Sequence, residues 1–176
     1  MRQQSYTLQK TMCGAVAVEL ALLSIPLLIL ALGAAEFGQA LYQYNTLVKT
    51  TRDAVRHLSH MNPTATGYSQ TQSEAKCLAV YGNIGCNGDP LAPGLTTSFV
   101  FICDSINTES GCKAITNYKN VATGTALTPG PTINLVEVGI SGYSFNFLFD
   151  PGAFLFLGGG EKSITFGDIR ATMRQS

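Results

Sequence analysis

An apolar run of 21 residues near the N-terminus constrains this chain more than any other feature. The run extends from Ala15 to Ala35 and contains one charged residue, Glu19. A helix of this length, at about 1.5 Å per residue, covers roughly 31 Å, which is close to the thickness of the hydrocarbon core of a bilayer. Its leucines and isoleucines favour insertion by about 3–5 kcal/mol in total, more than one acid near the end of the span costs. The run therefore predicts a transmembrane helix.

The fourteen residues before this run carry Arg2 and Lys10 and no acid. Because positive residues favour the cytoplasmic side of a membrane, this asymmetry predicts a cytoplasmic N-terminus and a chain that continues outside the cytoplasm. Three interpretations of the segment are open. It is a secretory signal cut before Glu36, an uncleaved anchor, or a prepilin-type leader, residues 1–14, that is cut after Gly14.

The third interpretation gives Glu19 a purpose. A cut after Gly14 makes Ala15 the new N-terminus, and its α-amine is mostly protonated near neutral pH. A carboxylate in apolar surroundings is stabilised by such a charge, so Glu19 of one subunit would pair with the Ala15 amine of the next. The alternative, from the spacing alone, is that Glu19 reaches toward the lipid headgroups.

Beyond the span, apolar residues recur in alternating steps of four and three, with Thr51 filling one gap, at Phe37, Leu41, Tyr44, Val48, Val55 and Leu58. This spacing places them on one face of a helix. Because no Pro or Gly lies between Gln39 and Met61, we predict one helix from Ala15 to Met61, with residues 36–61 as an amphipathic stalk. The stripe would pack either against a partner helix or against the head of the same chain.

The remainder, residues 62–176, predicts a β-rich head. Four segments have the character of strands, the last of them bent at Gly167: Leu95–Cys103, Thr132–Ile140, Tyr143–Phe149 and Ser163–Gln175. Turn residues between closely spaced strands favour an antiparallel sheet, and we expect the long helix to cover one face of it, which gives an α+β fold. We expect the apolar segment Ala153–Leu157 to be a core strand or a loop packed under the sheet or, if it is exposed, a subunit contact.

The cysteines favour disulfides over a metal site. Cys13 lies in the leader, and an even set remains outside the membrane, where disulfides persist: Cys77, Cys86, Cys103 and Cys112. Three pairings are open, and we prefer to join the cysteines nine residues apart, Cys77 with Cys86 and Cys103 with Cys112. No CxxC-like spacing occurs, and His57 and His60 lack a suitably spaced third ligand, so no metal is expected.

Charge and motifs exclude other classes of function. Eleven Lys and Arg balance eleven Asp and Glu, and charged residues make up 12% of the chain, which excludes a nucleic-acid partner bound through a basic surface. No GxSxG, HExxH, Walker or GxGxxG motif occurs, and the acids of the head are scattered. We therefore predict neither an enzyme nor a cofactor.

The N-terminal region resembles that of TadE-like proteins, which are pseudopilins or minor pilins of the tight-adherence (Tad) type IV pilus system. The resemblance is carried by Gly14–Glu19, the apolar run through Leu32, Glu36–Gly38, Ala40–Tyr42 and Arg52–Arg56, and Ile169–Gln175 is similar to the family's last strand.

This resemblance implies a pilin-like subunit in the bacterial inner membrane, with its N-terminus cytoplasmic and its head periplasmic, or built into a surface pilus. The implied partners are the lipid bilayer, a prepilin peptidase, other pilin subunits and inner-membrane pilus assembly proteins. Two other hypotheses are open: an uncleaved single-pass accessory protein of the secretion machinery, and a secreted binding or adhesin-like domain.

Overall fold

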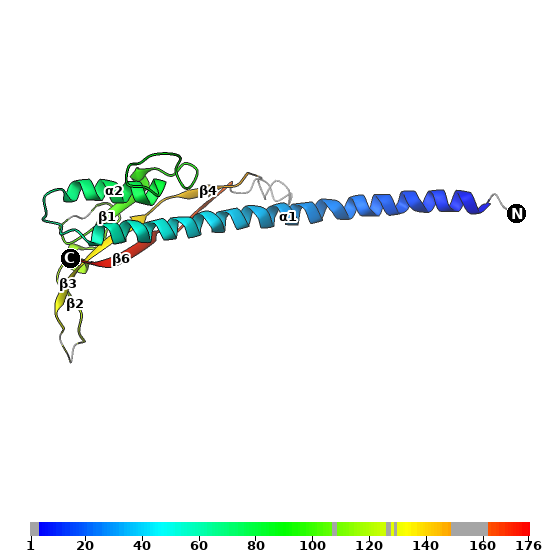
Figure 1. The fold of residues 1–176 in the computed structure, drawn as a ribbon. Helices are drawn as coiled ribbons and strands as arrows, with labels where there is room; N and C mark the ends of the chain where they lie inside the picture. The colour runs from blue at the N-terminus through cyan, green and yellow to red at the C-terminus, as the bar shows by residue number, and fades with distance from the viewer. Residues whose placement is uncertain (1–3, 107–108, 126–127, 129, 149–161) are drawn as a thin grey trace. The chain divides into compact units, whose positions relative to one another are not determined.

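The computed structural model describes residues 4–106, 109–125, 128, 130–148 and 162–176 (Figure 1). The chain divides into two compact units. The N-terminal unit consists of residues 1–39 and 147–162, and the head unit consists of residues 40–146 and 163–176. Each unit is considered by itself below.

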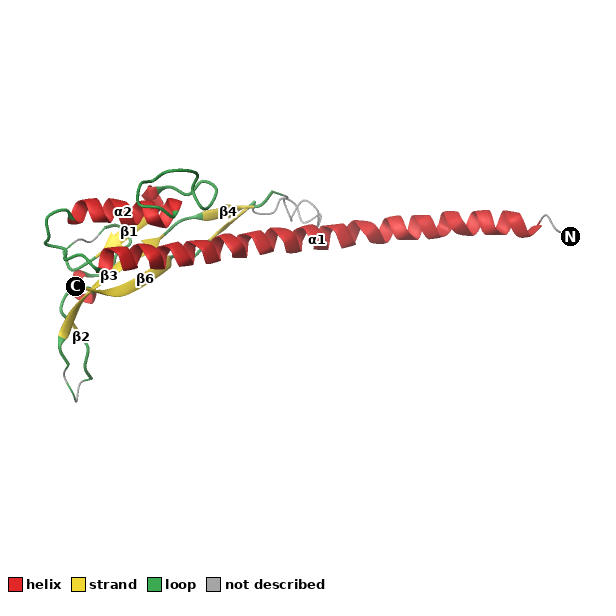
Figure 2. Ribbon diagram, in the orientation of Figure 1, coloured by secondary structure: helices red, strands yellow, loops and turns green. Residues whose placement is uncertain are grey.

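Helix α1 extends from Gln4 to Ser59 without interruption (Figure 2). It begins at Gln4 rather than at the predicted Ala15, and it ends at Ser59, two residues before the predicted Met61. Pro26 lies inside the helix, which membrane helices tolerate because neighbouring groups can satisfy the backbone carbonyl that proline leaves without its usual donor. Its last turns belong to the head unit.

The head contains a second helix, α2, from Tyr68 to Tyr81, which the sequence did not predict. Glycines in the left-handed conformation flank it: Gly67 has a φ of 92° and Gly82 a φ of 72°. Its buried positions are mostly small or polar, among them Thr71, Ala75 and Ala79. The helix therefore shows no strong apolar periodicity, and this is why sequence patterns overlook it.

The main sheet of the head is built around β3, Thr132–Ile140. Its antiparallel neighbours are β1 (Val100–Cys103), β2 (Val121–Ala122) and β6 (Ile169–Gln175). A separate antiparallel pair joins β4, Ser144–Asn146, to β5, Ser163–Thr165. A long helix with a small antiparallel sheet confirms the predicted α+β fold.

The strand predictions differ from the structure mainly at their ends. The bounds of β3 agree with the prediction. The first predicted strand loses its beginning because Thr97–Phe99 forms a 3-10 turn. The last one is divided around Gly167 into β5 and β6, which pair with different partners. β2 was not predicted, and Ala153–Leu157 lies outside the described residues.

The two faces of the sheet have different partners. Val136, Val138 and Ile140 face the main core, which also contains side chains of α1, α2, β1 and β6. Both helices therefore cover the same face. On the opposite face, the Phe101 ring packs on Gly139, and the Arg170 guanidinium lies 4.7 Å from the centre of that ring.

Gly139 leaves the space that the Phe101 ring occupies. A Cβ atom at Gly139 would lie 2.7 and 2.8 Å from the Cε1 and Cε2 atoms of Phe101. We predict that Gly139→Ala destabilises the head by about 1–3 kcal/mol, the usual cost of overpacking a well-packed site. Denaturant unfolding of the full-length chain in detergent measures this. The matched control is Gly167→Ala, whose Cβ would meet no atom within 4 Å; equal losses in the two variants would contradict the prediction.

Candidate functional site in the exposed apolar helix

The N-terminal part of α1 is a long apolar surface that the described residues of the chain leave exposed. Nine large apolar side chains between Val16 and Leu30 are each 59–74% exposed. A helix that is apolar around its whole circumference is typical of a membrane span or of the core of a larger assembly. Among the described residues, one helix is long and apolar enough to cross a membrane, judged by length and composition.

The predicted processing and assembly residues lie at the start of this surface. Gly14, Ala15 and Glu19 are all helical and exposed. The Glu19 carboxylate forms no hydrogen bond or ion pair with any residue that the structure describes. Glu19 is thus available to a partner outside the chain, but nothing within the chain tests the predicted pairing with an amine.

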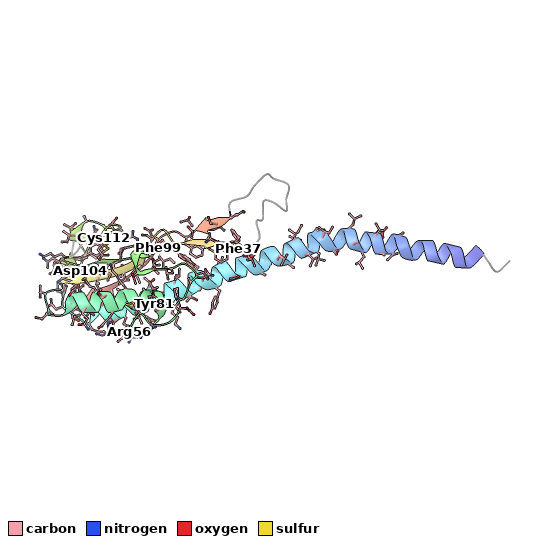
Figure 3. The ribbon with its side chains drawn as sticks, turned by 90° about the horizontal axis from the view of Figure 1, so that it is seen from above. Phe37, Arg56, Tyr81, Phe99, Asp104 and Cys112 are labelled. Atoms are coloured by element: carbon pink, nitrogen blue, oxygen red, sulfur yellow. A yellow bond between two sulfur atoms is a disulfide. The ribbon has the colours of Figure 1, made fainter. Side chains whose placement is uncertain are left out.

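At the other end of the apolar run, Glu36 contacts a distant part of the N-terminal unit. Its Oε2 atom accepts a hydrogen bond of 3.4 Å from the backbone N–H of Leu148. The Phe37 side chain is 56% exposed (Figure 3). Glu36 therefore has a partner within the chain, whereas Glu19 has none among the described residues.

The predicted stripe of the stalk is only partly buried. Thr51, Val55 and Leu58 are fully buried, whereas Phe37 and Leu41 are at least half exposed. The helix packs against the head of its own chain over its last turns, one of the two predicted alternatives.

Polar residues complete the buried face of α1. Gln43 Oε1 lies 3.0 Å from the Tyr143 hydroxyl, and Thr50 donates a 3.0 Å hydrogen bond to the Ala79 carbonyl. Because these side chains are polar, a search for apolar periodicity misses them.

Two disulfides close short loops in the head. Cys77 in α2 is joined to Cys86, and Cys103 at the end of β1 is joined to Cys112 (Figure 3). Each bond joins residues nine positions apart. They hold the end of α2 and the end of β1 to the segments that follow them.

A buried polar network ties the start of α2 to the sheet. The fully buried Asp104 accepts a hydrogen bond of 2.7 Å from the Tyr68 hydroxyl and one of 3.3 Å from the Gln72 amide. Its other oxygen accepts the N–H of Ile106 at 2.7 Å. Gln175 of β6 donates to the Tyr68 oxygen at 2.9 Å. Burial raises the pKa of Tyr68, and the hydrogen bond to Asp104 raises that pKa further.

His57, one of the two histidines considered as metal ligands, has a partner within the head. His57 lies 3.1 Å from Glu74 of α2, and His60 lies just past the end of α1. Among the described residues, no three histidine, cysteine, aspartate or glutamate side chains are grouped so that they could hold a metal ion.

These features point to a membrane-anchored protein with a disulfide-bonded α+β head. Residues 14–56 match the model of a family described as TadE-like protein. The match covers about a quarter of the chain and includes most of the apolar surface and the stalk. The match associates the chain with the Tad pilus and its other components. No curated protein and no solved structure was found to match the chain.

The raised pKa of Tyr68 gives a prediction for alkaline pH. In the unfolded chain a tyrosine loses its proton near pH 10, whereas the folded head keeps Tyr68 protonated to higher pH. Tyr68 therefore contributes its full stabilisation of the folded head below about pH 10, and this contribution is lost as the pH rises toward the pKa that Tyr68 has in the folded head. Between the two pKa values of Tyr68, its titration lowers the free energy of unfolding by about 1.4 kcal/mol per pH unit.

We expect the free energy of unfolding of Tyr68→Phe to fall less steeply with rising pH than that of the unsubstituted chain, by about 1.4 kcal/mol per pH unit. At pH 7 it should also cost about 1–3 kcal/mol, because Asp104 loses a hydrogen-bond donor in a buried site. Tyr118 and Tyr143 also have raised pKa values, so part of the decline remains. Denaturant unfolding at several pH values measures both effects, with the exposed Tyr42→Phe as control. If the free energy of unfolding falls as steeply with pH in Tyr68→Phe as in the unsubstituted chain, the network does not hold the Tyr68 proton.

Proposed function

We propose that this chain is a minor pilin or pseudopilin of a Tad-type IV pilus and secretion apparatus. The observation that carries the proposal is the uncovered apolar surface of α1, which contains a single acid and lies within the segment that matches the TadE-like family. Such a surface needs lipid before assembly and neighbouring helices after it. One segment thus serves as membrane anchor and as subunit contact.

The first step is insertion with the N-terminus in the cytoplasm. Arg2 and Lys10 precede the span and favour that orientation. The head then lies in the periplasm, where its two disulfides are stable. The protein is anchored in the bacterial inner membrane by this helix until it enters the pilus.

The second step is cleavage after Gly14 by a prepilin-type peptidase on the cytoplasmic side. In support of this step, the family match begins at Gly14. Cleavage exposes the amine of Ala15 and removes eleven residues of α1, Gln4 to Gly14, together with the positive charges that precede the span. Removal of those charges weakens the retention of this end at the cytoplasmic surface.

The third step is assembly with other pilin subunits. An acid near the centre of a bilayer costs about 2.5–3.5 kcal/mol, and an apolar helical stack is a comparable environment. The Ala15 amine of a neighbouring subunit would neutralise Glu19 there and would fix how far one helix is shifted along the next. Inner-membrane assembly proteins would bring the subunits together.

We predict that Glu19→Ala leaves the chain in the membrane but prevents its incorporation into the pilus. Without the acid, the apolar helix inserts at least as well, whereas the charge pair that sets the register is lost. Sheared pili and the membrane fraction of cells that express the full-length variant are compared by immunoblotting. Glu36→Ala is the matched control, because it removes an acid from the same helix beyond the apolar run.

Normal incorporation of Glu19→Ala into pili would contradict the charge-pairing step. Normal pilus assembly in cells of the variant, with the chain found only in the membrane fraction, would favour an uncleaved accessory protein of the apparatus. Release of the head into the periplasm as a free domain would contradict the pilin proposal and favour a secreted binding module.

A further inference from the structure

The outer side of α1 in the head unit carries a row of exposed cations. Lys49, Arg52 and Arg56 follow one another at steps of three and four, the spacing that places side chains on one side of a helix. All three are exposed, whereas Thr51 and Val55 between them are fully buried in the head. Figure 3 shows Arg56 at the margin of the head. We call these three residues the basic stripe.

The basic stripe has no partner within the part of the chain that the structure describes. The ion pairs formed there by the lysines and arginines of the head involve Lys76 and Arg170. Asp53 is the one acid between Lys49 and Arg56, so the stretch keeps an excess of two positive charges. The stripe therefore presents unneutralised charge to the surroundings of the head.

Asp53 lies four residues after Lys49 and three before Arg56, so it offsets part of the repulsion among the three cations along the helix. Like charges at steps of three or four repel one another along a helix by a few tenths of a kcal/mol. Other exposed cations of the head are spread over separate elements: Lys113, Lys119 and Arg174. Scattered charges of this kind are enough to keep a protein surface solvated. The alignment of three cations on one helix side instead matches a ligand with several aligned negative charges.

We propose that the basic stripe binds an acidic face of a different polypeptide. Two arginines suit carboxylates because the guanidinium can donate two parallel hydrogen bonds to them. A second copy of this chain does not offer such a face in the described residues of its head. Its exposed acids there lie on separate elements, and two of them are already paired with Lys76 or Arg170: Asp53, Asp89, Glu109 and Asp168.

This proposal rests on the head unit alone. It holds whether or not the leader is cleaved after Gly14 and whether or not Glu19 directs assembly. Its failure would leave the proposed pilin function intact, and the reverse is also true.

The test uses a photo-crosslinking amino acid at Asn45, which is exposed one turn before Lys49 on the same side of α1. The full-length chain is expressed in its own cells, and crosslinked segments are identified by mass spectrometry. One variant reverses the stripe with Lys49→Glu, Arg52→Glu and Arg56→Glu. The matched control makes the same change in charge at the three scattered cations, with Lys113→Glu, Lys119→Glu and Arg174→Glu.

We expect crosslinks to an acidic segment of another protein. Their yield should fall about tenfold in the stripe variant, as expected when three exposed ion pairs are lost together. The control should keep its yield, and reversing the acids of the partner segment should restore the crosslink to the reversed stripe. If the reversed chain is less stable in denaturant unfolding, the Gln variant of the same three residues replaces it.

Four results would overturn the proposal. They are crosslinks only to lipid, crosslinks only to other copies of this chain, a crosslink yield that is unchanged in the stripe variant, and the absence of any crosslink from Asn45.

Discussion

The rest of the structure depends on an apolar helix that the described residues leave uncovered, because such a surface requires lipid or neighbouring helices around it. Full burial of a large aliphatic side chain is worth about 1.5–3 kcal/mol, and nine such side chains between Val16 and Leu30 are largely exposed. The free energy gained by covering them exceeds what any single contact in the head contributes. Lipid and neighbouring helices are the two environments that can cover such a surface, and the proposed function uses them in succession.

The head gives the same helix a second role. Its last turns supply one wall of the core, and the C-terminal strand closes against them. The backbone N–H of Ser176 donates to the Ser59 carbonyl at 3.1 Å, and the Gln175 amide donates to the Met61 carbonyl at 3.2 Å. The long helix and β6 therefore meet in one core. The disulfides and the Asp104 network add local restraints to this small domain.

Much of the architecture could be predicted from local patterns. The apolar run predicts the long helix because its length and composition suit a membrane span. The turn-bounded segment Thr132–Ile140 predicts the central strand, whose last five residues are buried in the head. The sequence missed α2, whose buried face is made of residues such as Ala75 and Thr71. Only the C-terminal part of the predicted stalk stripe is buried in the head. Gln43 and Asp104 are buried because distant residues complete their hydrogen bonds, and such long-range partners leave no periodic signal along the chain.

The residues of the candidate site also divide into those that local sequence patterns predict and those whose role only the fold reveals. Glu19 is conspicuous in the sequence because a lone acid in an apolar run is costly, and the structure places it on an uncovered helix. The three cations of the basic stripe are visible in the sequence, but three cations in eight residues are ordinary there and do not indicate a site. Their meaning depends on which helix side the head buries, and only the folded head defines that side.

The most direct test of this account is the N-terminal sequence and intact mass of the mature chain, taken from membranes and from sheared pili of the same cells. The account predicts a chain that begins at Ala15 in the pili, with a free α-amine and both disulfides intact. A functional pilus subunit that still begins at Met1 would contradict it, because the amine that Glu19 requires would then not exist.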